Sequence, residues 1–226
     1  ATSTTQLSHS VAGGVWSSSD VNKATVDASS GLVTAVAAGT VTITYTLTSQ
    51  YGCISTKTIV ITINPVLVPT VSVVASATTI CNTTSVTFTA TPTNGGATPI
   101  YQWKKNGVNV GTNATTYSDA ALVNGDVVNC TMTSNATCYS VQVVTSNNIT
   151  MTVNPLPVVN AISGAATICA LNTVALSNTT PSGVWSSMNT GIATVNSSGV
   201  VTGVSGGSAT IRYTVTDSNG CITFVS

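Results

Sequence analysis

Six cysteines are the residues of this 226-residue chain whose chemistry the sequence predicts most directly. Thiols pair into disulfides in oxidising compartments such as the cell exterior, where small domains use them as covalent cross-links. The six are Cys53, Cys81, Cys130, Cys138, Cys169 and Cys221. We therefore expect an extracellular or cell-surface protein that is stabilised by disulfide bonds.

The residues from which active sites and metal sites are usually built are scarce. His9 is the only histidine, and it is not repeated in the second copy of the module. One such imidazole is weak grounds for a Ser–His–Asp arrangement. The acidic residues are five aspartates, too few and too scattered for an oxygen-rich cation site. We expect no catalytic residue, no metal site and no cofactor.

Charge is nearly absent from the chain. Five basic and five acidic residues make up 4% of the sequence and give a formal net charge of zero, whereas ordinary globular chains carry about 25% charged residues. Nucleic acids need clustered Lys and Arg, so we expect no nucleic-acid partner. No apolar run approaches the roughly 20 residues that span a bilayer, so we expect no membrane insertion in this segment.

Two parts of the sequence are close copies of each other. The matching stretches are Gly14–Ser18 with Gly183–Ser187, Ser30–Thr34 with Ser198–Thr202, and Gly52–Ile54 with Gly220–Ile222. The offset is 169 residues between Trp16 and Trp185 and 168 residues between Cys53 and Cys221. The repeat predicts a structural module that the chain uses more than once.

Alternation of apolar and polar residues dominates the chain and predicts half-buried β-strands. In Thr40–Thr48, the side chains of Val41, Ile43, Tyr45 and Leu47 share one face. The same alternation runs through Ile59–Ile63, Val86–Ala90, Val128–Met132, Ile149–Val153 and Ala209–Val215. No segment has a helical stripe, and Asn-Gly turns punctuate the strands, so we expect an all-β chain of β-sandwiches.

Two proline-containing linkers, Asn64–Pro69 and Asn154–Pro157, divide the chain. Proline fixes φ and removes a backbone donor, so each linker should be short and stiff. We expect three modules in series, which we call A1 (1–65), B (66–155) and A2 (156–226). We expect them to form an extended array with little contact between modules.

Sequence motifs in all three modules resemble known families. The A modules resemble the bacterial immunoglobulin-like group 2 domain, as seen in Val15–Asp20, Ala24–Asp27, Gly31–Val36 and Gly39–Ile43. Module B is similar to the immunoglobulin-like and polycystic-kidney-disease-like modules of giant Bacteroidota surface adhesins, as seen in Thr87–Pro92, Tyr101–Lys104, Asn106–Gly107 and Asn124–Val128.

The resemblance implies three tandem immunoglobulin-like β-sandwiches without enzymatic activity. It also implies export by the type IX secretion route, in some relatives linked to gliding motility. The expected function is that of a stiff, disulfide-bonded stalk in a large surface or filament-forming protein. The expected partners are neighbouring copies of the chain or adjacent immunoglobulin-like modules.

The positions of the cysteines within the modules predict how they pair. Modules B and A2 each have one cysteine just before the first core strand and one in a late turn or strand end. This placement predicts the pairs Cys81–Cys138 and Cys169–Cys221. Each bond would close a loop and stabilise its module by about 4 kcal/mol in the chain-entropy model.

The two remaining cysteines need separate explanations. Cys130 alternates with Val128 and Met132 on a buried face and is predicted to be a free core thiol, with a Cys81–Cys130 bond as the alternative. Cys53 has no obvious partner in A1, because the position that corresponds to Cys169 falls immediately before Ala1. We expect Cys53 to pair with a cysteine upstream of Ala1, in a longer array of which these residues are one window.

Three tryptophans, Trp16, Trp103 and Trp185, are expected in the module cores rather than as sugar-stacking platforms, because two of them recur in the same Gly-Val-Trp context. The Asn- and Thr-rich loops of B near Asn94–Pro99 and Asn109–Thr116 leave binding of surface glycans as an alternative function. A spacer in a secreted enzyme is the third hypothesis.

Overall fold

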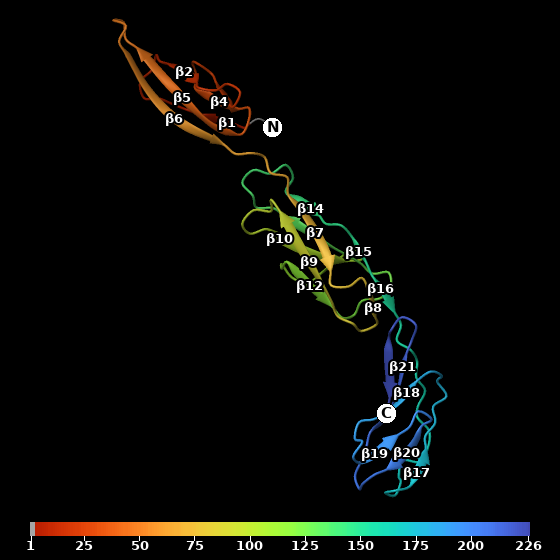
Figure 1. The fold of residues 1–226 in the computed structure, drawn as a ribbon. Helices are drawn as coiled ribbons and strands as arrows, with labels where there is room; N and C mark the ends of the chain where they lie inside the picture. The colour runs from red at the N-terminus through yellow and green to blue at the C-terminus, as the bar shows by residue number, and fades with distance from the viewer. Residues whose placement is uncertain (1–2) are drawn as a thin grey trace. The chain divides into compact units, whose positions relative to one another are not determined.

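A computed structural model of the chain describes residues 3–226. Within this range the regular secondary structure consists of β-strands alone (Figure 1). The A1 strands are β1 (Thr4–Gln6), β2 (Val15–Ser18), β3 (Ala24–Val26), β4 (Leu32–Ala35), β5 (Gly39–Thr48) and β6 (Ile54–Ile63). The A2 strands are β17 (Thr173–Ala175), β18 (Val184–Ser187), β19 (Ala193–Val195), β20 (Val200–Gly203), β21 (Ile211–Thr216) and β22 (Ile222–Val225). The all-β prediction is confirmed.

Module B contains ten further strands. They are β7 (Thr70–Ala75), β8 (Thr79–Cys81), β9 (Val86–Thr93), β10 (Ile100–Lys105), β11 (Val108–Val110), β12 (Thr116–Asp119), β13 (Val127–Thr133), β14 (Val143–Thr145), β15 (Ile149–Thr150) and β16 (Thr152–Asn154). One sheet has the order β11-β10-β13-β14, with β15 also paired to β13, and a second has the order β12-β9-β7. Strands β8 and β16 form a separate parallel pair.

The two A modules have the same topology. A1 consists of the three-stranded sheets β1-β4-β3 and β2-β5-β6, and A2 of the sheets β17-β20-β19 and β18-β21-β22. The register matches as well, because Trp16 pairs with Tyr45 and Trp185 pairs with Tyr213. The sequence repeat is therefore a repeat of strand order and register.

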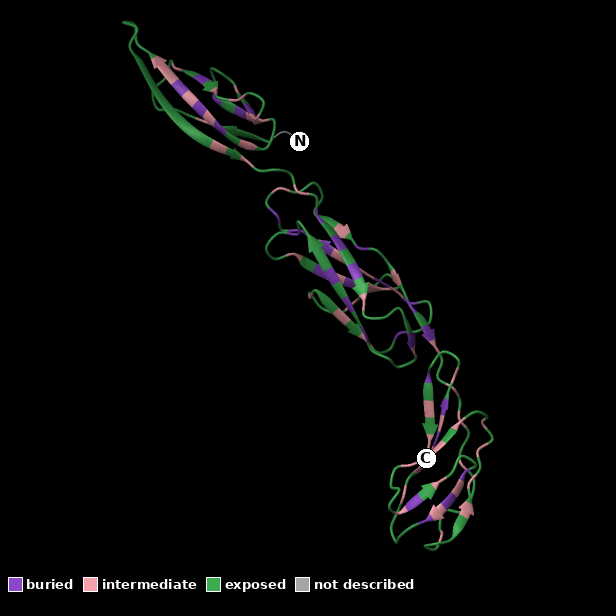
Figure 2. Ribbon diagram, in the orientation of Figure 1, coloured by how far each residue is buried: buried purple, intermediate pink, exposed green. Residues whose placement is uncertain are grey.

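Alternation along the strands places apolar side chains in the cores, as Figure 2 shows for β5 and β9. Phe88, Trp103 and Met132 are fully buried in the core of B. The core of A1 is smaller and is built around Trp16, Ala24, Val33, Val41, Ile43 and Tyr45. Burial of each large apolar side chain contributes about 1.5–3 kcal/mol, so these cores are the main source of module stability.

Strand pairing and compactness group the residues differently. Every strand pairing of the described residues lies within 4–63, 70–154 or 173–225. By compactness the chain forms two units, and the first contains the residues up to Thr70 together with Thr93–Pro99 and Thr133–Val143. The second unit contains the remaining residues of B and all of A2. The boundaries at 65/66 and 155/156 stay a prediction.

Candidate functional site

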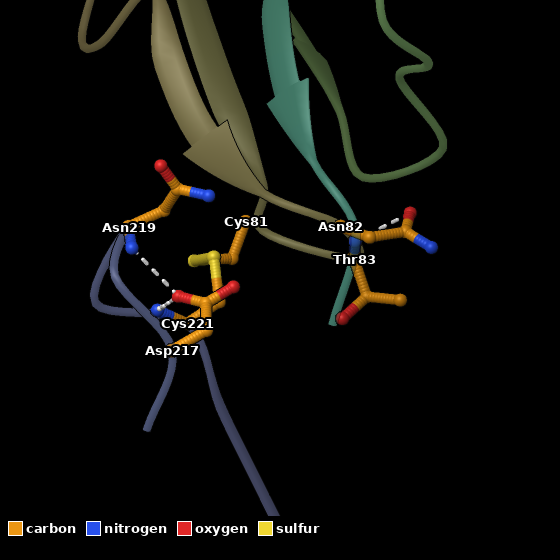
Figure 3. Close-up of a disulfide and its surroundings, with 6 residues drawn as sticks. All are labelled: Cys81, Asn82, Thr83, Asp217, Asn219 and Cys221. Carbon is orange, nitrogen blue, oxygen red and sulfur yellow. Dashed lines mark hydrogen bonds between the residues drawn. A yellow bond between two sulfur atoms is a disulfide. The ribbon is translucent and has the colours of Figure 1, made fainter. Parts of the chain in front are cut away.

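One disulfide bond links Cys81 to Cys221, which are 140 residues apart in sequence and 5.5 Å apart between Cα atoms (Figure 3). Cys81 ends β8, and the parallel pairing of β8 with β16 places it opposite Asn154. The amide of Asn82 donates a hydrogen bond of 2.8 Å to the carbonyl of Asn154 and fixes this end of β8. Cys221 is fully buried. The bond therefore joins the β8–β16 pair of B to A2.

The turn between β21 and β22 positions Cys221. The Asp217 carboxylate accepts hydrogen bonds of 2.8 Å from the amides of Asn219 and Cys221, as Figure 3 shows. The amide of Asp217 donates to the carbonyl of Cys221 at 3.0 Å, and Gly220 supplies the positive φ that the turn requires. The role of Asp217 was not predicted, although an Asp four residues before a Cys, with Asn-Gly between them, is a recognisable turn signal.

The predicted pairs Cys81–Cys138 and Cys169–Cys221 are wrong, since the structure bonds Cys81 to Cys221. Cys138 instead lies beside the linker, where its carbonyl accepts a hydrogen bond of 3.0 Å from the amide of Leu67, and it belongs to the other compact unit. Position in the sequence assigned each cysteine to a module but did not reveal at which end of the module it lies.

Geometry within A2 explains why its two cysteines do not pair. The carbonyl of Cys169 packs against Gly203, where a Cβ would lie 2.9 Å from the oxygen. Gly203 pairs with Ala193, which accepts a hydrogen bond from Ser187, and Ser187 pairs with Ile211 at the start of β21. The other cysteine follows the far end of β21. A six-residue strand spans about 20 Å, well beyond the roughly 7 Å that a disulfide allows between Cα atoms.

The turn that contains Cys53 in A1 copies the turn that contains Cys221. Ser49 replaces Asp217, and its hydroxyl accepts a hydrogen bond of 3.1 Å from the amide of Cys53. The amide of Ser49 donates to the carbonyl of Cys53 at 2.9 Å, as in A2. Cys53 is exposed and forms no disulfide within residues 3–226. Its predicted partner, upstream of Ala1, lies outside the described residues.

Cys138 lines a groove of about 820 Å³ in the first compact unit. The groove is also lined by Ser3 and Ala35 from one side of A1 and by Ile63 and Pro65 from the end of β6 and the linker. Cys138 is partly exposed and forms no disulfide within the described residues.

Cys130 lies fully buried on β13 in the core of B. Burial raises the pKa of its thiol to about 11, so the thiolate is not populated at neutral pH. It has no disulfide partner among residues 3–226, and the alternative Cys81–Cys130 bond is not present. A thiol of this kind packs as a small apolar side chain.

The three tryptophans lie among aromatic neighbours. Trp103 is fully buried, and its Nε1 donates to the carbonyl of Ala114 at 2.9 Å. Trp16 is 9% exposed and packs on Tyr45, with ring centroids 4.7 Å apart. Trp185 is half-buried against Tyr213 at 4.8 Å. Trp16 and Trp103 are thus buried with core residues, whereas Trp185 is only half-buried.

His9 and the few charged side chains of B make contacts within the chain. The ring of His9 stacks on Tyr45 at 4.4 Å. Lys105 forms an ion pair of 2.7 Å with Asp119. Partial burial raises the pKa of the Asp119 carboxyl, but hydrogen bonds from Lys105, the Ala121 amide and Tyr117 outweigh this effect, so the net pKa is lowered. No group of three His, Cys, Asp or Glu residues that could hold a metal ion occurs within residues 3–226.

Asparagine side chains fix the loops of B that were expected to be able to bind glycans. The Asn94 side chain donates to the carbonyl of Val68 at 3.0 Å, and the Asn113 side chain accepts from the Tyr101 amide at 2.8 Å. Asn135 bonds to both the amide and the hydroxyl of Thr98. These side chains shape the loops rather than extend toward a ligand.

Comparison with known families identifies a bacterial Ig-like domain (group 2) over residues 2–53. This match confirms the resemblance stated for A1. No curated protein matches the chain. No helix in the described residues is long and apolar enough to cross a membrane.

Solved structures with related folds are distant. A Ca²⁺-stabilised, ice-binding adhesin of an Antarctic bacterium is 17% identical, with 95% of this chain and 64% of that chain covered and a TM-score of 0.41. Murine CEACAM1b is 18% identical, with 59% and 69% covered and a TM-score of 0.33. The S-layer protein rSbsC is 14% identical, with 94% and 32% covered and a TM-score of 0.30. Similarities at this level assign no ligand or activity.

Proposed function

We propose that this chain is a structural segment of a large bacterial surface or extracellular filament protein, in which it acts as a disulfide-bonded, non-catalytic stalk. The observation that carries the proposal is the Cys81–Cys221 bond, which joins two modules of one chain across 140 residues. A covalent bond between two modules limits how far the chain can be extended, which suits a segment under tension.

The bond changes how tension applied to the two ends of the chain would travel. Force enters A1, reaches Cys81, and then passes through the disulfide directly to Cys221. Residues 82–220 lie outside this covalent path, so the chain between them cannot be pulled out to its full length while the bond is intact. In the chain-entropy model, closing a loop of this length also stabilises the folded state by about 5 kcal/mol.

The near absence of charge fits the same role. Long-range repulsion between neighbouring copies is weak when net charge is zero, which permits lateral association into bundles or filaments. The bacterial Ig-like domain at residues 2–53 supports a modular surface protein. Assignment to Bacteroidota and to type IX export remains part of the proposal.

Single-molecule stretching of the chain by its two ends tests the proposal. The oxidised chain should extend without releasing residues 82–220. The reduced chain should gain about 490 Å of contour length, at about 3.5 Å for each of the 140 residues. Cys221→Ser in oxidising buffer should behave like the reduced chain. Equal contour lengths for the oxidised and reduced wild-type chains would rule out a load-bearing bond.

A further inference from the structure

Four cysteines remain without a partner among residues 3–226, and three of them are accessible, since only Cys130 is buried. Cys53 and Cys169 are exposed, and Cys138 is partly exposed. The single disulfide shows which kind of bond this chain uses, since it joins one module to another rather than closing a loop inside one module. The accessible unpaired cysteines are therefore candidates for further disulfides between modules.

The repeat shows which position of A1 corresponds to Cys169 of A2. We call a cysteine at this position of an A module a Cys169-type cysteine. In A2, the Gly203 amide donates to the carbonyl of Asn172 at 3.1 Å. In A1, the Ala35 amide donates to the carbonyl of Ser3 at 3.0 Å. Ser3 thus corresponds to Asn172, and Ala35 corresponds to Gly203. The residue that corresponds to Cys169 is the position immediately before Ala1.

The same end of A1 carries the groove that contains Cys138. In A2, the carbonyl of Cys169 packs against Gly203, and the counterpart of Gly203 in A1, Ala35, lines the groove together with Cys138. Ser3, three residues after the counterpart of Cys169, lines it too. A cysteine placed before Ala1 and turning as Cys169 does would therefore approach Cys138. It would be a full β5 length, about 33 Å at 3.3 Å per residue, from Cys53.

We propose that Cys138 forms a disulfide with a Cys169-type cysteine of the A module that precedes it. Each A module is then bonded at both ends. The cysteine in its late turn, which corresponds to Cys221, bonds to the preceding B module. Its first cysteine, which corresponds to Cys169, bonds to the following B module. The inference deepens the proposed stalk function by naming the partner at each junction.

The bond forms by thiol–disulfide exchange with a small-molecule disulfide such as oxidised glutathione. The Cys138 thiolate attacks one sulfur of the oxidant and releases one glutathione thiolate. The thiolate of the second cysteine then attacks the Cys138 sulfur of the mixed disulfide and releases the second glutathione. The two cysteines lose two electrons and two protons, and these are recovered as two molecules of reduced glutathione.

Adding one cysteine immediately before Ala1 of the full chain tests the proposal. After oxidation with a glutathione redox buffer, peptide mapping by mass spectrometry should find the new cysteine bonded to Cys138 in most molecules. The Cys81–Cys221 bond in the same sample shows that the chain has folded and that oxidation has occurred.

Three matched variants complete the test. Cys138→Ser should abolish the new bond and leave the added thiol open to alkylation, Cys53→Ser should leave the bond intact, and a serine before Ala1 should leave Cys138 unpaired. A bond from the added cysteine to Cys53, or glutathione adducts on both it and Cys138 while Cys81–Cys221 forms, would overturn the proposal. Either result leaves the stretching experiment, and hence the stalk function, unaffected.

Discussion

At the scale of single residues, one tyrosine hydroxyl organises each A module. Tyr213 accepts a hydrogen bond from the Gly183 amide at 2.9 Å and donates to the carbonyl of Thr180 at 2.6 Å. In A1, Tyr45 accepts from Gly14 and donates to Val11 in the same way. A Cβ on either glycine would collide with the tyrosine ring, so close approach rather than an unusual φ requires glycine.

Gly183→Ala should therefore destabilise A2. The added methyl group displaces the Tyr213 ring and weakens both of its hydrogen bonds, which should lower the free energy of unfolding by about 1–3 kcal/mol. Gly191→Ala is the matched control, because a Cβ there meets nothing within 4 Å; it should change stability by less than about 0.5 kcal/mol. The hydrogen-exchange protection of β18 and β21 measures the stability of A2 in both variants. Equal protection in the two variants would contradict the packing argument.

Asp27 should make the stability of A1 fall in acid, and the corresponding turn of A2 should lack this effect. Backbone and hydroxyl hydrogen bonds from Ser30, followed by those from Ser29, lower the pKa of Asp27 from 3.8 to about 2. A lowered folded pKa means stabilisation above the unfolded value that is lost as pH falls from about 4 through 2. The counterpart Asn196 accepts the same kind of turn hydrogen bonds without titrating.

Asp27→Asn should remove this loss, so that β3 and β4 of the variant keep their hydrogen-exchange protection between pH 4 and pH 2 relative to wild type. The mirrored variant, Asn196→Asp, should introduce the same acid sensitivity into A2. An unchanged pH profile in both variants would show that the turn does not contribute to acid stability.

At the scale of strands, A2 is less completely paired than A1. Strand β5 pairs with β6 over ten residues, from Gly39 with Ile63 to Thr48 with Ile54. Strand β21 begins only at Ile211, because its preceding residues have no antiparallel partner within 3–226. A groove of about 560 Å³, lined by residues such as Val174, Leu176 and Val201, lies in A2. In A1, Ile61 and Ile63 pack on the core.

Appending Ile-Val-Ile-Thr-Ile-Asn, the sequence of 59–64, after Ser226 should extend the β21–β22 pairing. The two isoleucines that correspond to Ile61 and Ile63 would enter the groove and raise the free energy of unfolding by about 2 kcal/mol. The control is the same extension with serine at those two positions. Chemical denaturation and the hydrogen-exchange protection of 207–211 provide the measurement. Equal stability of the two extended chains would exclude burial in the groove.

The strands and their buried faces were largely predictable, but the ends of the modules at which the cysteines lie were not. Alternation assigned Val41 and Ile43 to a buried face, and the repeat implied that Trp16 and Trp185 occupy equivalent positions, because these patterns are local. Pairing between Cys81 and Cys221 depends on which end of A2 lies beside β8. That is a property of tertiary structure, and no periodicity in the sequence encodes it.

At the scale of the whole molecule, stability comes from cores, hydrogen bonds and a covalent bond rather than from ion pairs. Two ion pairs are present among residues 3–226, and the Lys23–Asp20 pair is at the surface, with contacting atoms 3.8 Å apart. Exposed pairs of this kind contribute about 0–1 kcal/mol. The chain can therefore do without charge for folding, although it relies on polar threonine and asparagine for its surface.

The loop closed by Cys81 and Cys221 also determines what a protease can achieve. A single backbone cut anywhere between 82 and 220 leaves the two fragments joined through sulfur, so the severed chain keeps its continuity. Of the five basic residues that a trypsin-like protease would recognise, Lys104, Lys105 and Arg212 lie inside this loop, and only Lys23 and Lys57 lie outside it. A cut at any of these three sites therefore leaves the two ends of the chain covalently connected.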